Sequence, residues 1–124
     1  MIASVGVDIV EIGRIEKDLQ RFGERFVDRI LGEREQVVYD QRRDRSAFLA
    51  GRFAAKEAVV KALGVYLHER PPLAQLEIVN DASGRPQLVV SDEIKARLRG
   101  ARCLLSITHE RKYAAAVAIF EEDR

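Results

Sequence analysis

The stretch GRFAAKEAVVKALG, Gly51–Gly64, decides how the rest of the chain is interpreted. Small and aliphatic side chains dominate it, and a glycine ends it, so it predicts a helix that packs in the interior. Yet Glu57 and Lys61 lie four residues apart near its centre, on one face of that helix. An exposed pair of this kind contributes only about 0.3–0.5 kcal/mol. Charges on so apolar a helix are costly unless something else binds them, so the stretch poses a choice between a surface ion pair and a site for phosphate and a divalent cation.

Length and composition limit the classes of protein to be considered. The 124 residues predict one domain, residues 1–124, and 47 % hydrophobic residues are enough for a packed core. A net charge of +1 does not favour nucleic acid or an anionic membrane as partner. The longest run without a charged residue, 113–120, is far shorter than the roughly 20 residues of a membrane helix. The start of the chain is unlike a signal peptide and Cys103 is the only cysteine, so we expect a cytoplasmic protein without disulfides.

Hydrophobic spacing outside the quoted stretch predicts an α+β fold with a mostly antiparallel sheet. Residues 2–9 predict a strand, and the period of the apolar residues from Ile12 predicts a helix that Gly23 interrupts and Gly32 ends. The further expected elements are a helix over 33–41, the long helix from a cap at Asp44 or Ser46 to Gly64, strands at 76–79 and 88–90, a helix between Ser91 and Gly100, and a closing hairpin of 103–108 and 113–121.

The last predicted strand, YAAAVAIF, is apolar on both faces. One face carries Ala115, Val117 and Ile119, and the other carries Ala114, Ala116, Ala118 and Phe120. An antiparallel strand with one solvated face alternates apolar with polar residues, so both faces of this strand should be covered. A helix of the same chain or a partner subunit could supply the second cover, and the pattern favours neither.

Two charged or titratable residues have an ordinary and a functional interpretation. Asp8 ends an apolar strand, where a carboxylate commonly caps the next helix but could also hold magnesium rigidly. His109 follows the strand LLSIT, where a lone histidine is usually a polar loop residue but could bind phosphate.

A basic stripe is expected on the first helical segment. It consists of Arg14, Lys17, Arg21 and Arg25, spaced three, four and four. Most such stripes are solvated faces. Acidic residues on the same segment would repel a duplex, so an acidic protein partner fits this stripe better than DNA does.

Three blocks of the sequence, in order and with matching spacing, carry a resemblance to a known family. They are GVDIVEIGRI (6–15), FLAGRFAAKEAVVKALG (48–64) and SITHERKYAAAVAI (106–119), and the turn NDASGRP (80–86) fits between them. They resemble the opening strand and helix, the signature helix and the closing hairpin of the holo-acyl-carrier-protein synthases, which are small 4′-phosphopantetheinyl transferases. The resemblance covers nearly the whole chain and implies the fold of that family.

The resemblance implies transfer of 4′-phosphopantetheine from coenzyme A to a serine of apo acyl carrier protein, with Mg²⁺ and with release of adenosine 3′,5′-bisphosphate. By matching motif, Asp8 and Glu57 would hold the metal, and Glu57 and Lys61 would be catalytic, Lys61 by neutralising the phosphates. The implied coenzyme A contacts are Lys61, Arg52, Arg45, His109, Ser106, Thr108 and Pro86, with His109, Arg52 and Arg45 near the 3′-phosphate. The implied docking residues for the acidic carrier protein are Arg14, Arg21 and Arg25. The family is trimeric with sites between subunits, which would explain the doubly apolar last strand.

Several alternatives stay open on the sequence alone. Either Glu57 or a water on the metal could accept the proton of the attacking serine. After KALG the family has a glycine-rich turn, whereas this chain has VYLHERPP, in which Tyr66 and His68 add bulk. This departure admits a non-catalytic trimeric binding protein as a rival interpretation. A small structural domain, in which Glu57 and Lys61 form only an ion pair, is another.

Overall fold

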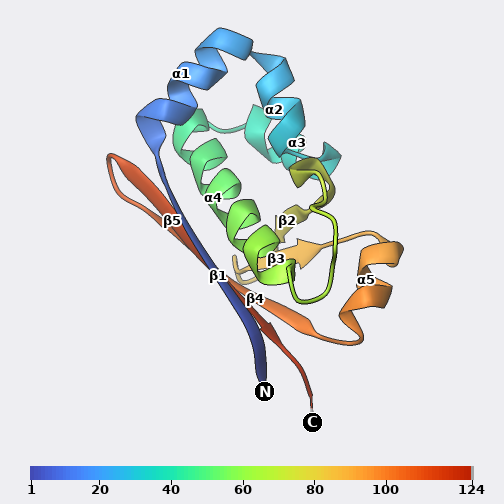
Figure 1. The fold of residues 1–124 in the computed structure, drawn as a ribbon. Coiled ribbons are helices and arrows are strands. Elements are labelled where there is room, and N and C mark those ends of the chain that lie inside the picture. Colours follow the sequence, from blue (N-terminus) through green and yellow to red (C-terminus); the bar gives the residue numbers. More distant parts are fainter. Residues whose placement is uncertain (124) are drawn as a thin grey trace.

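The computed structural model describes residues 1–123 as two antiparallel sheets and five α-helices, which confirms the predicted α+β class (Figure 1). In chain order the elements are β1 Ile2–Glu11, α1 Ile12–Phe22, α2 Glu24–Ile30, α3 Glu33–Asp40, α4 Arg45–Leu63, the 3₁₀ turn η1 Leu73–Gln75, β2 Glu77–Asn80, β3 Pro86–Val89, α5 Asp92–Leu98, β4 Arg102–His109 and β5 Tyr113–Glu121. Within the described residues, no helix is long and apolar enough to cross a membrane.

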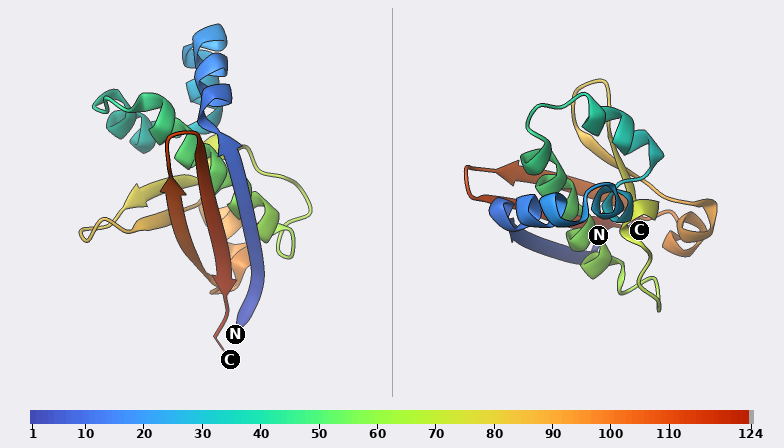
Figure 2. Two further views of the ribbon diagram at one scale, coloured as in Figure 1. Left: turned by 90° about the vertical axis from the view of Figure 1, so that its left-hand side faces the viewer. Right: turned by 90° about the horizontal axis from the view of Figure 1, so that it is seen from above.

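The larger sheet has the strand order β1-β5-β4, so the last strand is the central one (Figure 2). β5 pairs antiparallel with β1, where Asp8 lies opposite Ala116, and with β4, where Ser106 lies opposite Val117. β2 and β3 form a separate two-stranded sheet, in which Ile78 lies opposite Leu88. β1 and β4 are therefore the two edges of the larger sheet, and β5 lies between them.

α4 packs across one face of the larger sheet because its inner side is made of small residues. Ala54, Ala58 and Ala62 have no exposed surface. Gly6 of β1 lies so close to the helix that a Cβ there would overlap the carbonyl oxygen of Ala58 and come within 2.9 Å of the nitrogen of Ala62. Glycine opposite alanine thus allows the strand to touch the helix backbone.

Within residues 1–123, nothing covers the opposite face of the larger sheet. Ala114, Ala116, Ala118 and Phe120 of β5 are buried, on the same side of the sheet as α4. The other face, here called the open face, consists of Val5, Val7, Ile9, Leu104, Ala115, Val117 and Ile119. The members on β1 and β4 are more than half exposed. A helix of the same chain therefore covers one apolar face of β5, and the described part of the chain leaves the second one open.

The helix boundaries follow the sequence signals with small shifts. Gly23, at φ 59°, separates α1 from α2, a backbone conformation that glycine adopts without strain. Asp44 is the N-cap residue of α4, but its side chain makes no capping hydrogen bond. Its carboxylate instead pairs with Arg42 at 2.7 and 2.8 Å, and this bond lowers the pKa of Asp44. β1 extends to Glu11, two residues beyond its predicted end, and β3 begins at Pro86, before its predicted start.

A buried ion pair, which the sequence did not indicate, joins α4 to the elements around it. Lys56 and Glu35 are both inaccessible, and the Lys56 ammonium donates to the Glu35 carboxylate and to the carbonyl of Ile30. A third bond from Lys56 reaches the carbonyl of Leu73 at 3.2 Å, and Glu35 accepts the N–H of Ile78 at 3.0 Å. Burial lowers the pKa of Lys56, and the Glu35 charge opposes that shift. The pair ties α3, α4, η1 and β2 together.

Candidate active site

Asp8 and Lys61 meet where β1 crosses α4. Asp8 lies on the sheet face that α4 covers, opposite Ala116, and its side chain is 18 % exposed. The Lys61 Nζ lies 3.2 Å from Asp8 Oδ1 and donates to the carbonyl of Val7 at 2.9 Å. Asp8 does not cap the following helix, since the N-cap position of α1 is Glu11. The interpretation of Asp8 as a helix cap is therefore wrong, and its carboxylate instead belongs to a charged cluster.

Glu57 and Lys61 do not pair with each other. The Glu57 Oε2 lies 2.6 Å from Nη2 of Arg70, and Lys61 pairs with Asp8 instead. The Glu57 carboxylate is 17 % exposed and Arg70 57 %. The interpretation of Glu57 and Lys61 as a simple surface pair on one helix is therefore wrong. We call Asp8, Glu57, Lys61 and Arg70 the carboxylate cluster.

The carboxylate cluster has the donor chemistry of a magnesium site completed by a substrate. Magnesium takes one or two protein carboxylates and fills its remaining positions with water and phosphate oxygens. Asp8 on β1 and Glu57 on α4 supply two such carboxylates beside one lysine. In residues 1–123, no group of three or more His, Cys, Asp or Glu side chains could hold a metal by itself. The residues thus fit a divalent cation that shares its coordination with ligand oxygens.

A pocket of about 660 Å³ lies between the β2–β3 turn and β4, and we call it the hairpin pocket. Three of the predicted coenzyme A residues line it: Arg52, Pro86 and Ser106. The half-buried Cys103 also lines it, and burial raises the pKa of that thiol to about 12. The hairpin pocket is therefore lined by the Arg52 guanidinium from α4, by the β2–β3 turn and by β4.

Arg52 is the one buried cation that the hairpin pocket contains. Its guanidinium lies over the Phe48 ring at 4.7 Å and approaches Asn80 Oδ1 at 3.5 Å and Glu35 Oε2 at 3.9 Å. Its Nε is buried without a hydrogen-bond partner, and burial lowers the pKa of the group. Arg52 lines the hairpin pocket, so its cationic guanidinium is placed to attract an anion there.

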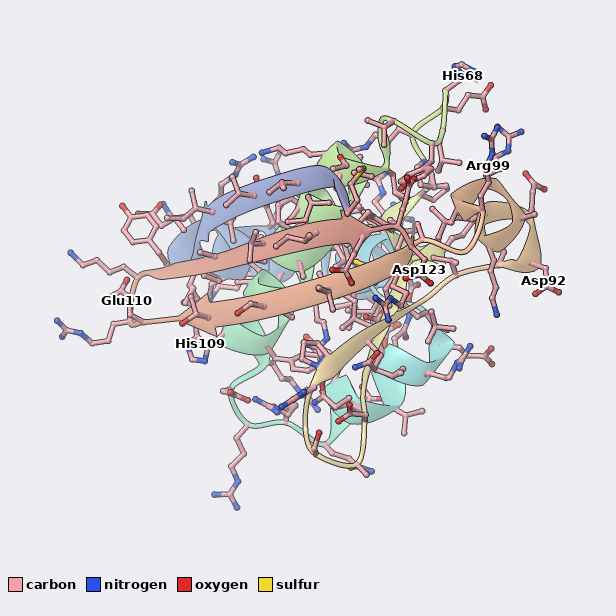
Figure 3. All side chains as sticks on the ribbon, turned by 90° about the horizontal axis from the view of Figure 1, so that it is seen from below. His68, Asp92, Arg99, His109, Glu110 and Asp123 are labelled. Carbon is pink, nitrogen blue, oxygen red and sulfur yellow. The ribbon has the colours of Figure 1, made fainter. Side chains whose placement is uncertain are left out.

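The remaining predicted coenzyme A residues lie outside the hairpin pocket. Figure 3 shows His109 and Glu110 at the tip of the β4–β5 hairpin, and Thr108 and His109 are exposed. Arg45, at the start of α4, donates to the carbonyl of Asp40 at 2.8 Å and lies over the Tyr39 ring. The structure therefore gathers three of these residues at the pocket, places Lys61 in the carboxylate cluster, and leaves Arg45, Thr108 and His109 on the surface.

The carboxylate cluster and the hairpin pocket are at opposite edges of the larger sheet. Asp8 belongs to the edge strand β1, and the pocket runs along the other edge strand, β4. The central strand β5 lies between them. One chain thus presents two separate groups of candidate site residues.

The predicted basic stripe is interrupted at Gly23. Arg14, Lys17 and Arg21 are exposed on α1, whereas Arg25 is exposed on α2, beyond the turn at φ 59°. The helical spacing that predicted one continuous stripe therefore holds for the first three residues only.

The comparisons with known proteins agree over nearly the entire chain. The model of the 4′-phosphopantetheinyl transferase superfamily matches residues 4–118. The holo-[acyl-carrier-protein] synthase of Chlamydia trachomatis is 45 % identical over 117 residues, which are 94 % of this chain and 98 % of its own. That of Protochlamydia amoebophila is 39 % identical over 120 residues, which are 97 % of this chain and 98 % of its own.

Solved structures of such synthases have the same fold. The synthase of Neisseria meningitidis superposes with a TM-score of 0.89 at 33 % identity, covering 98 % of this chain and 100 % of its own. The synthase of Bacillus anthracis, solved in complex with CoA (3′,5′-ADP), gives 0.81 at 37 % identity and covers 99 % of both chains. The Helicobacter pylori synthase, solved in complex with coenzyme A, gives 0.83 at 33 % identity and covers 94 % and 99 %.

Proposed function

This chain belongs to the 4′-phosphopantetheinyl transferase superfamily, among its holo-[acyl-carrier-protein] synthases, and we propose that it transfers 4′-phosphopantetheine from coenzyme A to a serine of apo acyl carrier protein with Mg²⁺. The serine oxygen forms a bond to the phosphorus that carries the pantetheine. The bond from this phosphorus to the bridging oxygen breaks, and adenosine 3′,5′-bisphosphate leaves. The observation that carries the proposal is that Lys61 of α4 pairs with Asp8 of β1, one helical turn from Glu57 on the same face of α4.

The side chains of the carboxylate cluster suit phosphoryl transfer, which needs positioning and charge neutralisation more than covalent help. We propose that Asp8 and Glu57 hold the magnesium, which when bound neutralises charge on the pyrophosphate. Lys61 uses two of its three N–H donors on Asp8 and on the carbonyl of Val7 and is 55 % exposed. Its third donor is left for a phosphate oxygen. The serine proton has two candidate acceptors, the Glu57 carboxylate and a water molecule.

We propose that the hairpin pocket receives the nucleotide end of coenzyme A. The Arg52 guanidinium, which lines this pocket, supports an anion there, and Pro86 and Ser106 line the same pocket. Arg45, Thr108 and His109 would contact this end from the surface beside it, with the histidine near the 3′-phosphate. The relatives solved with coenzyme A support this substrate.

We propose that the chain forms a homotrimer with its active sites between subunits. Two features support this assembly: the open face is apolar and uncovered, and the two groups of site residues lie at opposite sheet edges. A head-to-tail contact closes into a ring when its rotation permits. In such a ring, the β1 edge of one copy would meet the β4 edge of the next and complete the site.

Incubation with apo acyl carrier protein, coenzyme A and Mg²⁺, followed by intact-mass analysis, tests the proposed function. We expect the carrier protein to gain the mass of one phosphopantetheine group, and to gain none when coenzyme A is omitted or EDTA is added. A non-catalytic binding protein would instead be stabilised against heat by coenzyme A and Mg²⁺ without any transfer. A purely structural domain would show neither effect, and either result would contradict the proposal.

A further inference from the structure

Arg70 already neutralises the Glu57 carboxylate, and nothing in the proposed reaction accounts for this contact. Its Nη2 lies 2.6 Å from Glu57 Oε2, and the carboxylate is mostly buried while the guanidinium is mostly exposed. Two cations that approach the same carboxylate oxygens compete, since each neutralises the same charge. A divalent ion that binds Glu57 must therefore compete with Arg70 for the same carboxylate oxygens.

The segment that follows Arg70 keeps it beside α4. Pro71 follows it and restricts the Arg70 backbone to extended conformations, and Pro72 stiffens the next position. The carbonyl of Leu73 then accepts a hydrogen bond from Lys56, the neighbour of Glu57 on α4. The segment thus returns to α4 next to Glu57. The same segment, VYLHERPP, contains no glycine.

We propose that Arg70 is a resident counter-ion of Glu57, which a divalent cation displaces and which then pairs with a phosphate oxygen of coenzyme A. This inference rests on the proposed function, because it takes Glu57 as a metal ligand. Arg70 thereby lowers the metal affinity of the free chain. It also couples metal binding to coenzyme A binding, because the phosphates give the displaced guanidinium a new partner.

The test is a titration of the full chain with Mn²⁺, in which electron paramagnetic resonance measures the free ion, with and without coenzyme A. The proteins are wild type, Arg70→Gln and the matched control Arg34→Gln. Arg34 forms an ion pair with Glu77 in which the exposed fractions are 63 % and 15 %, close to those of Arg70 and Glu57. Without coenzyme A, we expect Arg70→Gln to bind Mn²⁺ about two- to fivefold more tightly than wild type, the range that an exposed ion pair supports. Coenzyme A should raise the Mn²⁺ affinity of Arg70→Gln less than that of wild type, and Arg34→Gln should behave as wild type does.

The proposal is overturned if Arg70→Gln binds Mn²⁺ no more tightly than wild type does. It is also overturned if coenzyme A raises the Mn²⁺ affinity of wild type and of Arg70→Gln equally, or if none of the three proteins binds Mn²⁺. Glu57→Gln distinguishes this failure from a failure of the proposed function. If Glu57→Gln binds Mn²⁺ as tightly as wild type does, Glu57 is not a metal ligand, and the magnesium assignment itself is wrong.

Discussion

At the scale of single residues, each charge of the candidate site depends on a partner from another element. Asp8→Asn and Glu57→Gln each remove a carboxylate charge but almost no volume. We expect each to lower kcat/KM for transfer by about 100-fold or more, the size of effect seen when one electrostatic contact to a transition state is lost. Thermal unfolding should change little, because the cations left behind are more than half exposed.

The control for these two variants is Glu77→Gln, which neutralises an equally covered carboxylate in an ion pair with Arg34. Its transfer rate should stay near that of wild type. Full activity of either Asp8→Asn or Glu57→Gln at low Mg²⁺ would contradict the metal assignment.

The buried pair of Lys56 and Glu35 leads to a prediction on stability. Lys56→Met removes the ammonium that contacts the buried Glu35 carboxylate and leaves only the more distant Arg52 guanidinium, at 3.9 Å, as its cation, so we expect a cost of about 3 kcal/mol. Adding Glu35→Gln should recover part of the loss, because the amide oxygen can still accept the N–H of Ile78. Urea unfolding measures both values. Arg102→Gln, which breaks an exposed pair with Glu121, is the control and should cost less than about 1 kcal/mol. A Lys56→Met chain as stable as this control would show that the buried pair is dispensable.

The sequence indicated some charged residues of the structure and missed others, and the difference lies in whether a local sequence pattern marks the residue. Asp8, Glu57 and Lys61 were visible because each interrupts an apolar pattern. Arg70 and Glu35 were not, because each partner lies on a different element and no helical period relates the two. Local spacing therefore indicates where charges stand out, but only the fold determines which of them meet.

At the scale of elements, α1 carries the predicted docking surface for the carrier protein. Reversing Arg14 and Arg21 to Glu should raise the KM for carrier protein severely and leave coenzyme A binding nearly unchanged, because exposed charges at an interface rim act mainly on association. Added salt should slow wild type more than the variant, since the Debye length falls from about 10 Å at 0.1 M to about 3 Å at 1 M salt.

Lys95→Glu with Arg97→Glu, the same change of charge on α5, is the matched control for this experiment and should leave the KM for carrier protein unchanged. Weaker coenzyme A binding by the α1 variant would instead assign the stripe to the nucleotide site. An effect equal to that of the control would make it an ordinary solvated face.

The elements themselves were largely predictable, whereas their pairing was not. The period of apolar residues and the glycines at 23, 32 and 64 located the helices, and the turn NDASGRP located the β2–β3 hairpin. That β5 pairs with β1 as well as with β4 was not visible, because strand pairing across the whole chain leaves no local pattern. For the same reason the sequence could not separate the small sheet from the large one.

At the scale of the whole molecule, the two faces of β5 should respond differently to the same charge. Val117→Glu lies on the open face, so we expect a folded monomer that has lost transfer activity. Ala116→Glu places a charge in the buried layer beneath α4, so we expect loss of the fold. Light scattering after size exclusion and circular dichroism measure these outcomes. A wild-type chain that runs as a monomer would contradict the trimer. The trimer stays a prediction. So do the single domain over residues 1–124 and the cytoplasmic location.

Because Gly6 has no side chain, β1 can lie against the backbone of α4, and this close contact has a consequence for ion selectivity. Because a Cβ there would overlap the backbone of Ala58, Gly6→Ala must push β1, and Asp8 with it, away from the helix α4 that carries Glu57. Oxygen ligands lie about 2.0–2.1 Å from Mg²⁺ and 2.3–2.6 Å from Ca²⁺, so a wider gap suits the larger ion better. We expect Gly6→Ala to lower the ratio of Mg²⁺ to Ca²⁺ affinity in calorimetric titrations of the folded protein. Gly13→Ala, where a Cβ meets no atom within 4 Å, should leave the ratio unchanged. Equal ratios in the two variants would mean that this contact does not set the size of ion that the chain prefers.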